Sequence, residues 1–453
     1  MHDELRSLQY SGVAEACPGL TLLESKDIGS GWELDFHTAA GVSPLGLLWA
    51  EECFQGGTRW AAKVLDMSYV AVDVGVMGNR IFVRHSEPDR ELFMTQQGRR
   101  VARSANAKWL RTKRFLAGGL QAVAVARDVE ASLRFARDYQ RRAWRLHFLF
   151  MYALKALLME ALEALGDQGS LAADLVASLA SVPTSVRVEL AELQAAATAD
   201  DLDRLLRGRG DRFLLSQDVS SLTLAGAIDG GLDVSKFALP SGSRSSRSPA
   251  VRPPALPSTA LEDANYLWWS EDHYAAVEWR AGIPLRVAAT RAAEDLRIPT
   301  EDVFFLFWHE LLQALRQGGV SDPLSREVST RRALAESSLP TPAKRPSEVR
   351  GVGLTSGSWV GPAKFVRRPE DVGALPSGGF VLLAEDLPSS SYGLIARAGA
   401  CVIEHGSLLS HSAIICRELN IPLLSGAVGV SGWEGFSGLL HVDADAGFAR
   451  VVE

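Results

Sequence analysis

The chain has 453 residues, a formal net charge of -7 at pH 7 and 47% hydrophobic residues. This length allows two or three domains with cores of their own. The acidic balance gives no electrostatic basis for binding nucleic acid or an anionic membrane. Cys17, Cys53, Cys401 and Cys416 show no C-x-x-C spacing, so the sequence predicts neither a zinc site nor a disulfide framework. A reducing cytoplasm is the simplest setting for such a chain.

The first half of the chain reads as mostly helical. Pro44 stands near the first position of a predicted helix. Residues 69–84 alternate small apolar residues around a Gly78-Asn79 turn, which predicts a β-hairpin. Residues 86–224 carry Ala, Leu, Arg and Glu at helical spacing, which predicts several long antiparallel helices. Residues 148–165 among them contain three charged residues, so we expect an amphipathic helix rather than a membrane span.

Two segments interrupt the predicted helices. Residues 240–257 are rich in Pro, Ser and Arg and poor in bulky apolar residues, which predicts a mobile loop. Residues 329–349 combine prolines with charged residues, which predicts an extended tether. The expected organisation is therefore a mostly helical domain over residues 1–328, a linker over residues 329–349 and a last domain over residues 350–453.

The stretch Gly399–Gly426 carries the clearest chemistry. Ala400–Ile403 is an apolar run typical of a buried strand, and a Gly/Ser loop follows it. Ser410 stands at the N-cap of a predicted helix over His411–Leu419. The first amides of a helix have no intrahelical partners and attract anions. A histidine at that point can carry a phosphoryl group, although a lone histidine at a helix start is more often a capping or solvated residue.

This stretch resembles the swivelling phosphohistidine domain of the phosphoenolpyruvate-utilising enzymes, among them phosphoenolpyruvate synthase, pyruvate phosphate dikinase and rifampin phosphotransferase. Ser407, Cys416 and Asn420 depart from the usual pattern. The resemblance extends over about residues 350–453 and implies an α+β multidomain protein, in which a largely helical substrate domain precedes a β/α swivelling domain. The residues in register with the family signature are Glu404, Gly406, Ser410, His411, Ala413, Ile414, Arg417, Glu418, Ile421, Pro422 and Gly426.

The resemblance also implies roles for individual residues. It assigns the nucleophile and phosphoryl carrier to His411, phosphate binding to Ser410, Ser412 and Arg417, and orientation of the imidazole to Glu404. A structural alternative for Arg417 is an ion pair with Glu418 or Glu404. No metal site is expected on this chain.

A second stretch, residues 262–316, resembles the end of the central domain in the rifampin phosphotransferase type of enzyme. Glu271, Asp272 and His273 form an acid, acid, base cluster there. Such a cluster could orient and deprotonate a hydroxyl group of a small-molecule acceptor. An equally good interpretation is that the two acids cap a helix and the histidine makes a structural hydrogen bond.

In the fused relatives an ATP-grasp domain precedes these domains, and this sequence contains no P-loop motif. We therefore expect one component of a split, dikinase-type phosphotransferase. A separate ATP-grasp protein would hold ATP and Mg²⁺ and charge His411, which would pass the phosphoryl group to a hydroxyl or carboxylate of a small molecule. One alternative is elimination (dehydration) or condensation of the activated substrate, and another is a non-catalytic binding or scaffold subunit.

Overall fold

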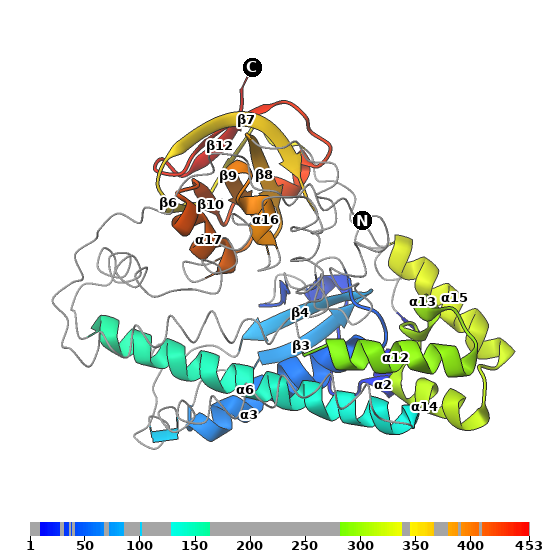
Figure 1. The fold of residues 1–453 in the computed structure, drawn as a ribbon. Coiled ribbons are helices and arrows are strands. Elements are labelled where there is room, and N and C mark those ends of the chain that lie inside the picture. The colour runs from blue at the N-terminus through cyan, green and yellow to red at the C-terminus, as the bar shows by residue number, and fades with distance from the viewer. Residues whose placement is uncertain are drawn as a thin grey trace, which may run out of the picture. The chain divides into compact units, whose positions relative to one another are not determined.

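The computed structural model describes residues 10–27, 31–35, 38, 41–67, 72–85, 100–101, 128–163, 281–337, 345–366, 379–387, 391–406 and 410–452. The chain divides into two compact units (Figure 1). The first unit contains Met1–Glu160, Ser216–Ser221 and Tyr274–Leu339, and the second contains Ala161–Leu215, Leu222–His273 and Pro340–Glu453. The described parts combine helices with parallel and antiparallel strands, so the chain is α+β.

The first unit contains a small mixed sheet. Its strands lie in the order β1-β3-β4-β2, with β1 parallel to β3 and the other pairs antiparallel. The β3/β4 pair turns at Gly78, whose φ of 66° suits glycine, and this pair confirms the predicted hairpin. The strands are β1 (Thr21–Leu22), β2 (Glu33–Leu34), β3 (Val72–Met77) and β4 (Arg80–His85), and the short helix α2 (Val13–Ala16) precedes them.

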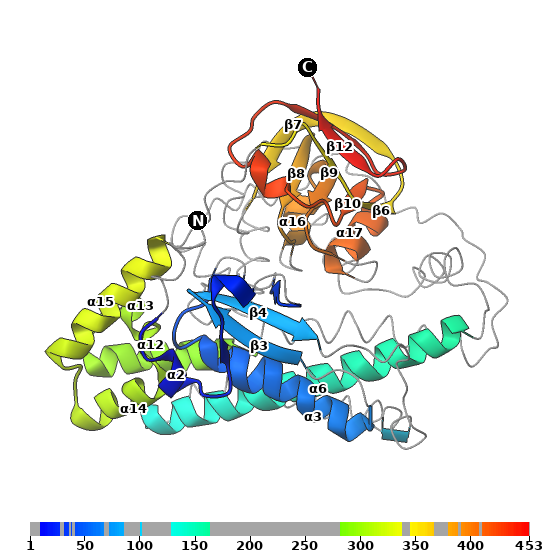
Figure 2. The same cartoon turned by 180° about the vertical axis from the view of Figure 1, so that it is seen from behind.

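Helices form the rest of the first unit. A π-helical segment at Trp49–Gln55 leads directly into α3, and α6 is an uninterrupted helix of 35 residues. Rings from the π-helical segment pack on α6, and Figure 2 shows α3 and α6 side by side. Apolar residues of α6, α12, α14 and α15 share one core. The helices are α3 (Gly56–Leu65), α6 (Val129–Glu163), α12 (Ile283–Leu296), α13 (Thr300–Val303), α14 (Trp308–Gln317) and α15 (Asp322–Ser337).

Helix α15 corrects the prediction of an extended tether from residue 329. The helix continues to Ser337, because residues 322–337 contain no glycine and proline occurs only at Pro323 in the first turn. Val328 and Arg331 are both buried against the first unit, which holds this part of the helix in place. The other end of the predicted linker also differs, since residues 348–350 form a strand.

The second unit is built on an eight-stranded sheet in the order β5-β12-β11-β7-β8-β9-β10-β6. The four neighbours from β7 to β10 are parallel, and the remaining pairs are antiparallel. The strands are β5 (Glu348–Arg350), β6 (Val352–Thr355), β7 (Ser358–Phe365), β8 (Phe380–Ala384), β9 (Ala398–Ile403), β10 (Leu423–Ser425), β11 (Leu439–Asp443) and β12 (Phe448–Val451).

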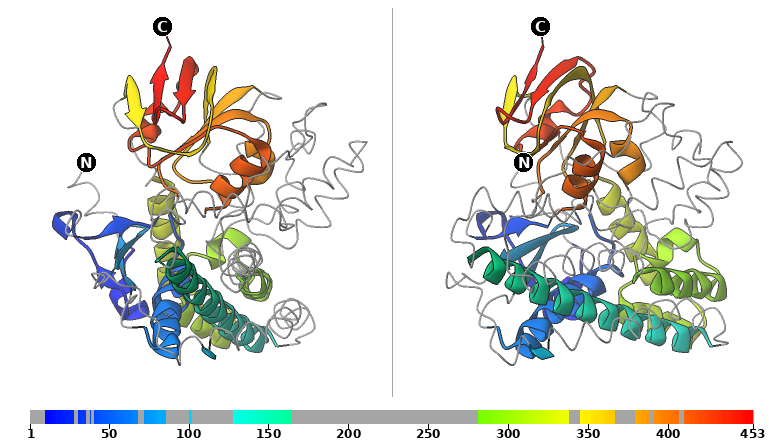
Figure 3. Two further views of the ribbon diagram at one scale, coloured as in Figure 1. Left: turned by 90° about the vertical axis from the view of Figure 1, so that its left-hand side faces the viewer. Right: turned by 60° about the vertical axis from the view of Figure 1, so that its left-hand side comes forward.

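One continuous segment joins the two edges of this sheet. Strands β5 and β6 are separated only by Gly351, yet they stand at opposite ends of the strand order, so the sheet curls until its edges meet (Figure 3). The backbone is closely packed where the chain passes from β5 to β6. A Cβ atom on Gly351 would lie 2.4 Å from the carbonyl oxygen of Ser425, and one on Gly353 would lie 1.9 Å from that of Ala444. Only glycine fits at these two positions.

The curled sheet has a core on each face. On β8, Val381 and Leu383 pack inside the curl together with Trp433, whereas Leu382 packs beneath two helices on the opposite face. Those helices are α16 (Tyr392–Ile395) and α17 (His411–Leu419). Strand β8 is therefore buried on both faces, as its continuous apolar sequence requires. This arrangement fixes α17 against the sheet.

Candidate functional site

Helix α17 begins where the sequence predicted. Strand β9 ends at Ile403, and the helix starts at His411 after an N-cap at Ser410 with extended backbone angles of φ -66° and ψ 154°. The amide of Ala413 donates a hydrogen bond of 3.3 Å to Ser410 Oγ. Asn420 closes the helix in the left-handed conformation, with φ 51°. The predicted strand, cap and helix are all confirmed.

Two serines flank His411 in the first turn. The Oγ atoms of Ser410 and Ser412 are 3.0 Å apart, so one hydroxyl donates to the other, and Ser412 is fully buried. His411 is the first residue of the nine-residue helix, where the amide groups are not used by intrahelical bonds. The dipole of the helix adds positive potential at the same place. An anion attached to residue 411 would therefore meet a favourable field.

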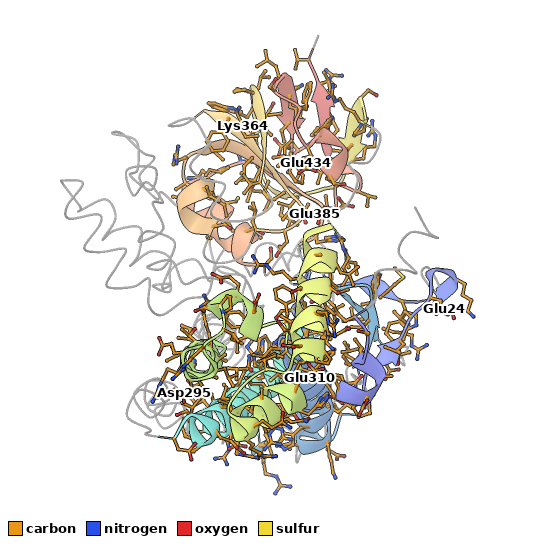
Figure 4. All side chains as sticks on the ribbon, turned by 90° about the vertical axis from the view of Figure 1, so that its right-hand side faces the viewer. Glu24, Asp295, Glu310, Lys364, Glu385 and Glu434 are labelled. Carbon is orange, nitrogen blue, oxygen red and sulfur yellow. The ribbon has the colours of Figure 1, made fainter. Side chains whose placement is uncertain are left out.

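The turn between β9 and α17 is anchored on the neighbouring strand. The amide of Glu404 donates to the carbonyl oxygen of Ala384 at 3.2 Å, and the amide of His405 donates to that of Glu385 at 2.8 Å. Glu385, at the carboxyl end of β8, is labelled in Figure 4. Glu404 Oε2 is buried and has no hydrogen-bond partner within the described ranges. The carboxylate of Glu404 thus lies on a fixed turn with one oxygen free to accept.

Arg417 lies farther from the start of the helix. It is half-buried and stands six residues beyond His411, which corresponds to about 9 Å along a helix axis. Its backbone is therefore not beside the first turn, and a phosphate-binding role would depend on its long side chain reaching back. The predicted cluster of Glu271, Asp272 and His273 lies outside the described residues and stays a prediction.

The aromatic residues of α6 pack on one another. Trp144, His147 and Tyr152 are buried, and the ring centroids of Trp144 and His147 are 5.1 Å apart. Trp49 from the π-helical segment lies 5.4 Å from Trp144 with its ring nearly perpendicular. This mutual packing of buried rings is typical of core residues.

All four cysteines are free and buried. Burial, with smaller contributions from Glu51 and Glu52, raises the pKa of Cys17 to about 12. Burial also raises the pKa of Cys53 and of Cys416 well above the usual range. Thiolate nucleophiles require a lowered pKa and some exposure, so these thiols are unsuited to that role.

Over the described ranges, no group of three or more His, Cys, Asp or Glu side chains is arranged to hold a metal ion. None of the helices in the same ranges is both long and apolar enough to cross a membrane.

Comparison with known proteins points to one family. The family described as "PEP-utilising enzyme, mobile domain" matches residues 376–447, which include the whole of β8, β9, α17 and β10. The uncharacterised protein Rv2047c of Mycobacterium tuberculosis is 33% identical over 105 residues, which cover 23% of this chain and 12% of that protein. Pyruvate kinase 2 of Synechocystis sp. is 29% identical over 98 residues, covering 22% of this chain and 16% of that protein. The chain therefore spans less than a fifth of the length of these relatives.

A chain from the crystal structure of the holo-form of aconitase X from Thermococcus kodakaraensis is also similar. It is 17% identical with a TM-score of 0.20, and the match covers 24% of this chain and 100% of that chain. A score of this size carries no argument about the fold or the function of the present protein.

Proposed function

We propose, from the match of residues 376–447 to the mobile domain of PEP-utilising enzymes, that His411 carries a phosphoryl group between two active sites. The observation that supports this proposal is the position of His411. It is the first residue of α17 and lies between the N-cap Ser410 and the buried Ser412. Free amides, two hydroxyls and a helix dipole at one residue suit a covalently held phosphoryl group.

The first half-reaction charges the histidine. An imidazole nitrogen of His411 attacks the β-phosphorus of ATP, the bond from that phosphorus to the α-phosphate oxygen breaks, and AMP leaves. His411 then carries the β,γ-pyrophosphoryl group. Water attacks the γ-phosphorus, the bond from that phosphorus to the bridging oxygen breaks, and phosphate leaves, so that the β-phosphoryl group stays on His411. We propose that a separate ATP-grasp protein holds ATP and Mg²⁺ for this step, as the fused relatives hold them in an attached domain.

The second half-reaction transfers the phosphoryl group from His411 to the acceptor. An acceptor oxygen attacks the phosphorus of phosphohistidine, the N–P bond breaks, and the electron pair returns to the imidazole. A nearby base takes the proton when the acceptor is a hydroxyl group. The acceptor is a small molecule with a hydroxyl or carboxylate, bound by residues 1–328.

The residues of the turn and the helix have separate tasks in this scheme. Ser410 holds phosphoryl oxygens together with the first amides of α17, and Ser412 keeps the Ser410 hydroxyl in place through the 3.0 Å contact of their Oγ atoms. The free Oε2 of Glu404 accepts a hydrogen bond from the imidazole and sets which nitrogen is nucleophilic. Arg417 adds positive charge along the helix.

Labelling with ATP tests the proposal. The chain is incubated with β- and γ-labelled ATP, alone and with any ATP-grasp protein found encoded beside it. We expect acid-labile, base-stable label from the β position only, dependent on the partner and absent in His411→Ala. Label that persists in His411→Ala, or no label with the partner, would contradict the carrier function. Product analysis then distinguishes a phosphorylated acceptor from a dehydrated or condensed one.

A further inference from the structure

Ser425 lies at the same edge of the sheet as the start of α17. It is the last residue of β10, which pairs in parallel with β9 through Leu423↔Cys401 and Leu424↔Val402. Parallel strands end at a common edge, so β10 ends beside the point where β9 passes into the turn that leads to His411. The two segments are separated by the whole of α17 in the sequence and meet in space.

The side chain of Ser425 is on the helix face of the sheet. Leu423 packs in the core beneath α17, whereas Leu424 packs inside the curl. Side chains alternate along a strand, so Ser425 points to the same face as Leu423. Contact with the turn supports this placement, since a Cβ atom on Gly406 would lie 2.8 Å from Ser425 Oγ. The hydroxyl group therefore lies against the turn that leads into the site.

The hydroxyl of Ser425 is buried without a partner. The residue is 2% exposed, and its Oγ atom makes no hydrogen bond to any residue in the described ranges. A buried hydroxyl that lacks a partner destabilises the folded state, and an alanine of similar size would avoid this cost. Such a group is explained when another state of the protein supplies an oxygen for it to bond.

We propose that Ser425 is a further phosphoryl-binding residue of this site: in the charged protein its hydroxyl donates a hydrogen bond to a peripheral oxygen of the phosphoryl group on His411. This inference rests on the proposed carrier function. The N–P bond breaks through a loose transition state in which charge moves from the peripheral oxygens toward the departing nitrogen. A hydrogen bond to a peripheral oxygen therefore stabilises phosphohistidine more than the transition state, and it slows spontaneous hydrolysis.

The test uses the full chain and a chemical phosphoryl donor, so that no partner protein is needed. Phosphoramidate charges His411 in the wild type, in Ser425→Ala and in Thr355→Val, and mass spectrometry follows the half-life of the phosphohistidine at neutral pH. Thr355 is the matched control because its hydroxyl belongs to the neighbouring strand β6 and is satisfied. It donates to the carbonyl oxygen of Ile421 at 2.6 Å and accepts from the amide of Leu423 at 2.7 Å.

We expect Ser425→Ala to shorten the half-life about tenfold, as when a hydrogen bond to a charged group is lost. The melting temperature of the uncharged Ser425→Ala protein should stay equal to or rise above that of the wild type. Thr355→Val should show the reverse, with a lower melting temperature and an unchanged half-life. Ser425→Cys, which keeps the size but donates weakly, should fall between wild type and Ser425→Ala in half-life.

Two results would contradict the role of Ser425 and leave the carrier function standing. One is a phosphohistidine half-life in Ser425→Ala within about twofold of the wild-type value. The other is a melting temperature of uncharged Ser425→Ala that falls as far as that of Thr355→Val. The first would show that the hydroxyl does not touch the phosphoryl group, and the second that it has a structural partner. A wild-type chain that takes no label on His411 from phosphoramidate or from ATP would overturn this inference and the carrier function together.

Discussion

At the scale of single residues, Ser410 performs two tasks that can be separated. It caps α17 by accepting a hydrogen bond from the amide of Ala413, and its hydroxyl contacts Ser412. The cap stabilises the folded protein, whereas contact of the hydroxyl with the phosphoryl group is part of the proposed carrier function.

Replacing Ser410 by alanine should remove both tasks. We expect Ser410→Ala to lower the free energy of unfolding by about 1 kcal/mol, since alanine cannot cap the helix, and to reduce labelling of His411. Ser410→Asp keeps a capping oxygen and should unfold like the wild type in urea. It should still label poorly, because a carboxylate repels the phosphoryl oxygens. Wild-type labelling in Ser410→Asp would argue against contact between residue 410 and the phosphoryl group.

The buried thiol of Cys17 should make the stability of the fold depend on pH in the alkaline range. Burial raises its pKa to about 12 from an ordinary value of 9.0, so the folded state keeps the proton that the unfolded state releases. The contribution of the protonated thiol to the free energy of unfolding is fully present below pH 9, and it is lost as the pH rises from 9 to about 12. The slope for one such group is about 1.4 kcal/mol per pH unit. Urea unfolding at pH 8, 9, 10 and 10.5 should show a smaller slope in Cys17→Ala, and an equal slope in both proteins would contradict the raised pKa.

At the scale of elements, helix α17 was predictable to the residue and α15 was not. Ser410 and Pro422 bracket a short apolar run at helical spacing, and local chemistry alone sets both ends of α17. The prolines at 340, 342 and 346 indicate an extended tether, whereas residues 329–337 before them form a helix. Nothing local marks the π-helical segment Trp49–Gln55, whose bonding depends on packing against α6.

The contact that holds the end of α15 is also long-range. Arg331 is 3% exposed, and both of its terminal nitrogens bond to Glu310 on α14, at 2.7 and 3.0 Å. Nη1 also donates to the carbonyl oxygen of Phe305 at 3.1 Å, and the guanidinium lies 4.4 Å from the ring centre of Phe307. Glu310 is labelled in Figure 4. Periodicity in the sequence gives no sign of this pairing between two helices.

Removing Arg331 should therefore be costly. We expect Arg331→Met to lower the free energy of unfolding by about 3 kcal/mol, because the half-buried carboxylate of Glu310 is left without its partner. The double variant Arg331→Met/Glu310→Gln removes that charge and keeps an acceptor for the amide of Phe307, which bonds to Glu310 Oε2 at 2.9 Å. The double variant should regain part of the lost free energy of unfolding, as measured by urea unfolding. A double variant no more stable than Arg331→Met would show that the charge is not the cause.

At the scale of the whole molecule, the strands of the second unit could be located but their order could not. Residues such as Ala400–Ile403 indicate strands locally, and the family resemblance placed them in one domain. The order of the sheet depends on which edges pair, and Val352 pairs with Ser425, some seventy residues later. For the site, the sequence predicted His411 and its two serines. It gave no sign of Ser425, the further residue that we propose, because nothing near that residue in the sequence shows that its strand ends beside the turn.

The closure of the sheet can be tested by a substitution at Gly353. A Cβ atom on Gly353 would overlap the carbonyl oxygen of Ala444, which belongs to the backbone and cannot turn aside. We expect Gly353→Ala to lower the free energy of unfolding by about 3 kcal/mol or more, the upper range for overpacking. Gly319→Ala, where a Cβ atom meets nothing within 4 Å, is the matched control and should unfold like the wild type. Equal urea midpoints for the two variants would contradict the closure.

The same crossing determines how the second unit responds to force. The chain enters the described sheet through β5 and continues through Gly351 into β6, and these strands bond to β12 and β10 respectively. A pull along the axis of β5 would load its hydrogen bonds to β12 together in shear rather than open them one after another. Because β5 continues directly into β6, the same load would pass to both edges of the sheet.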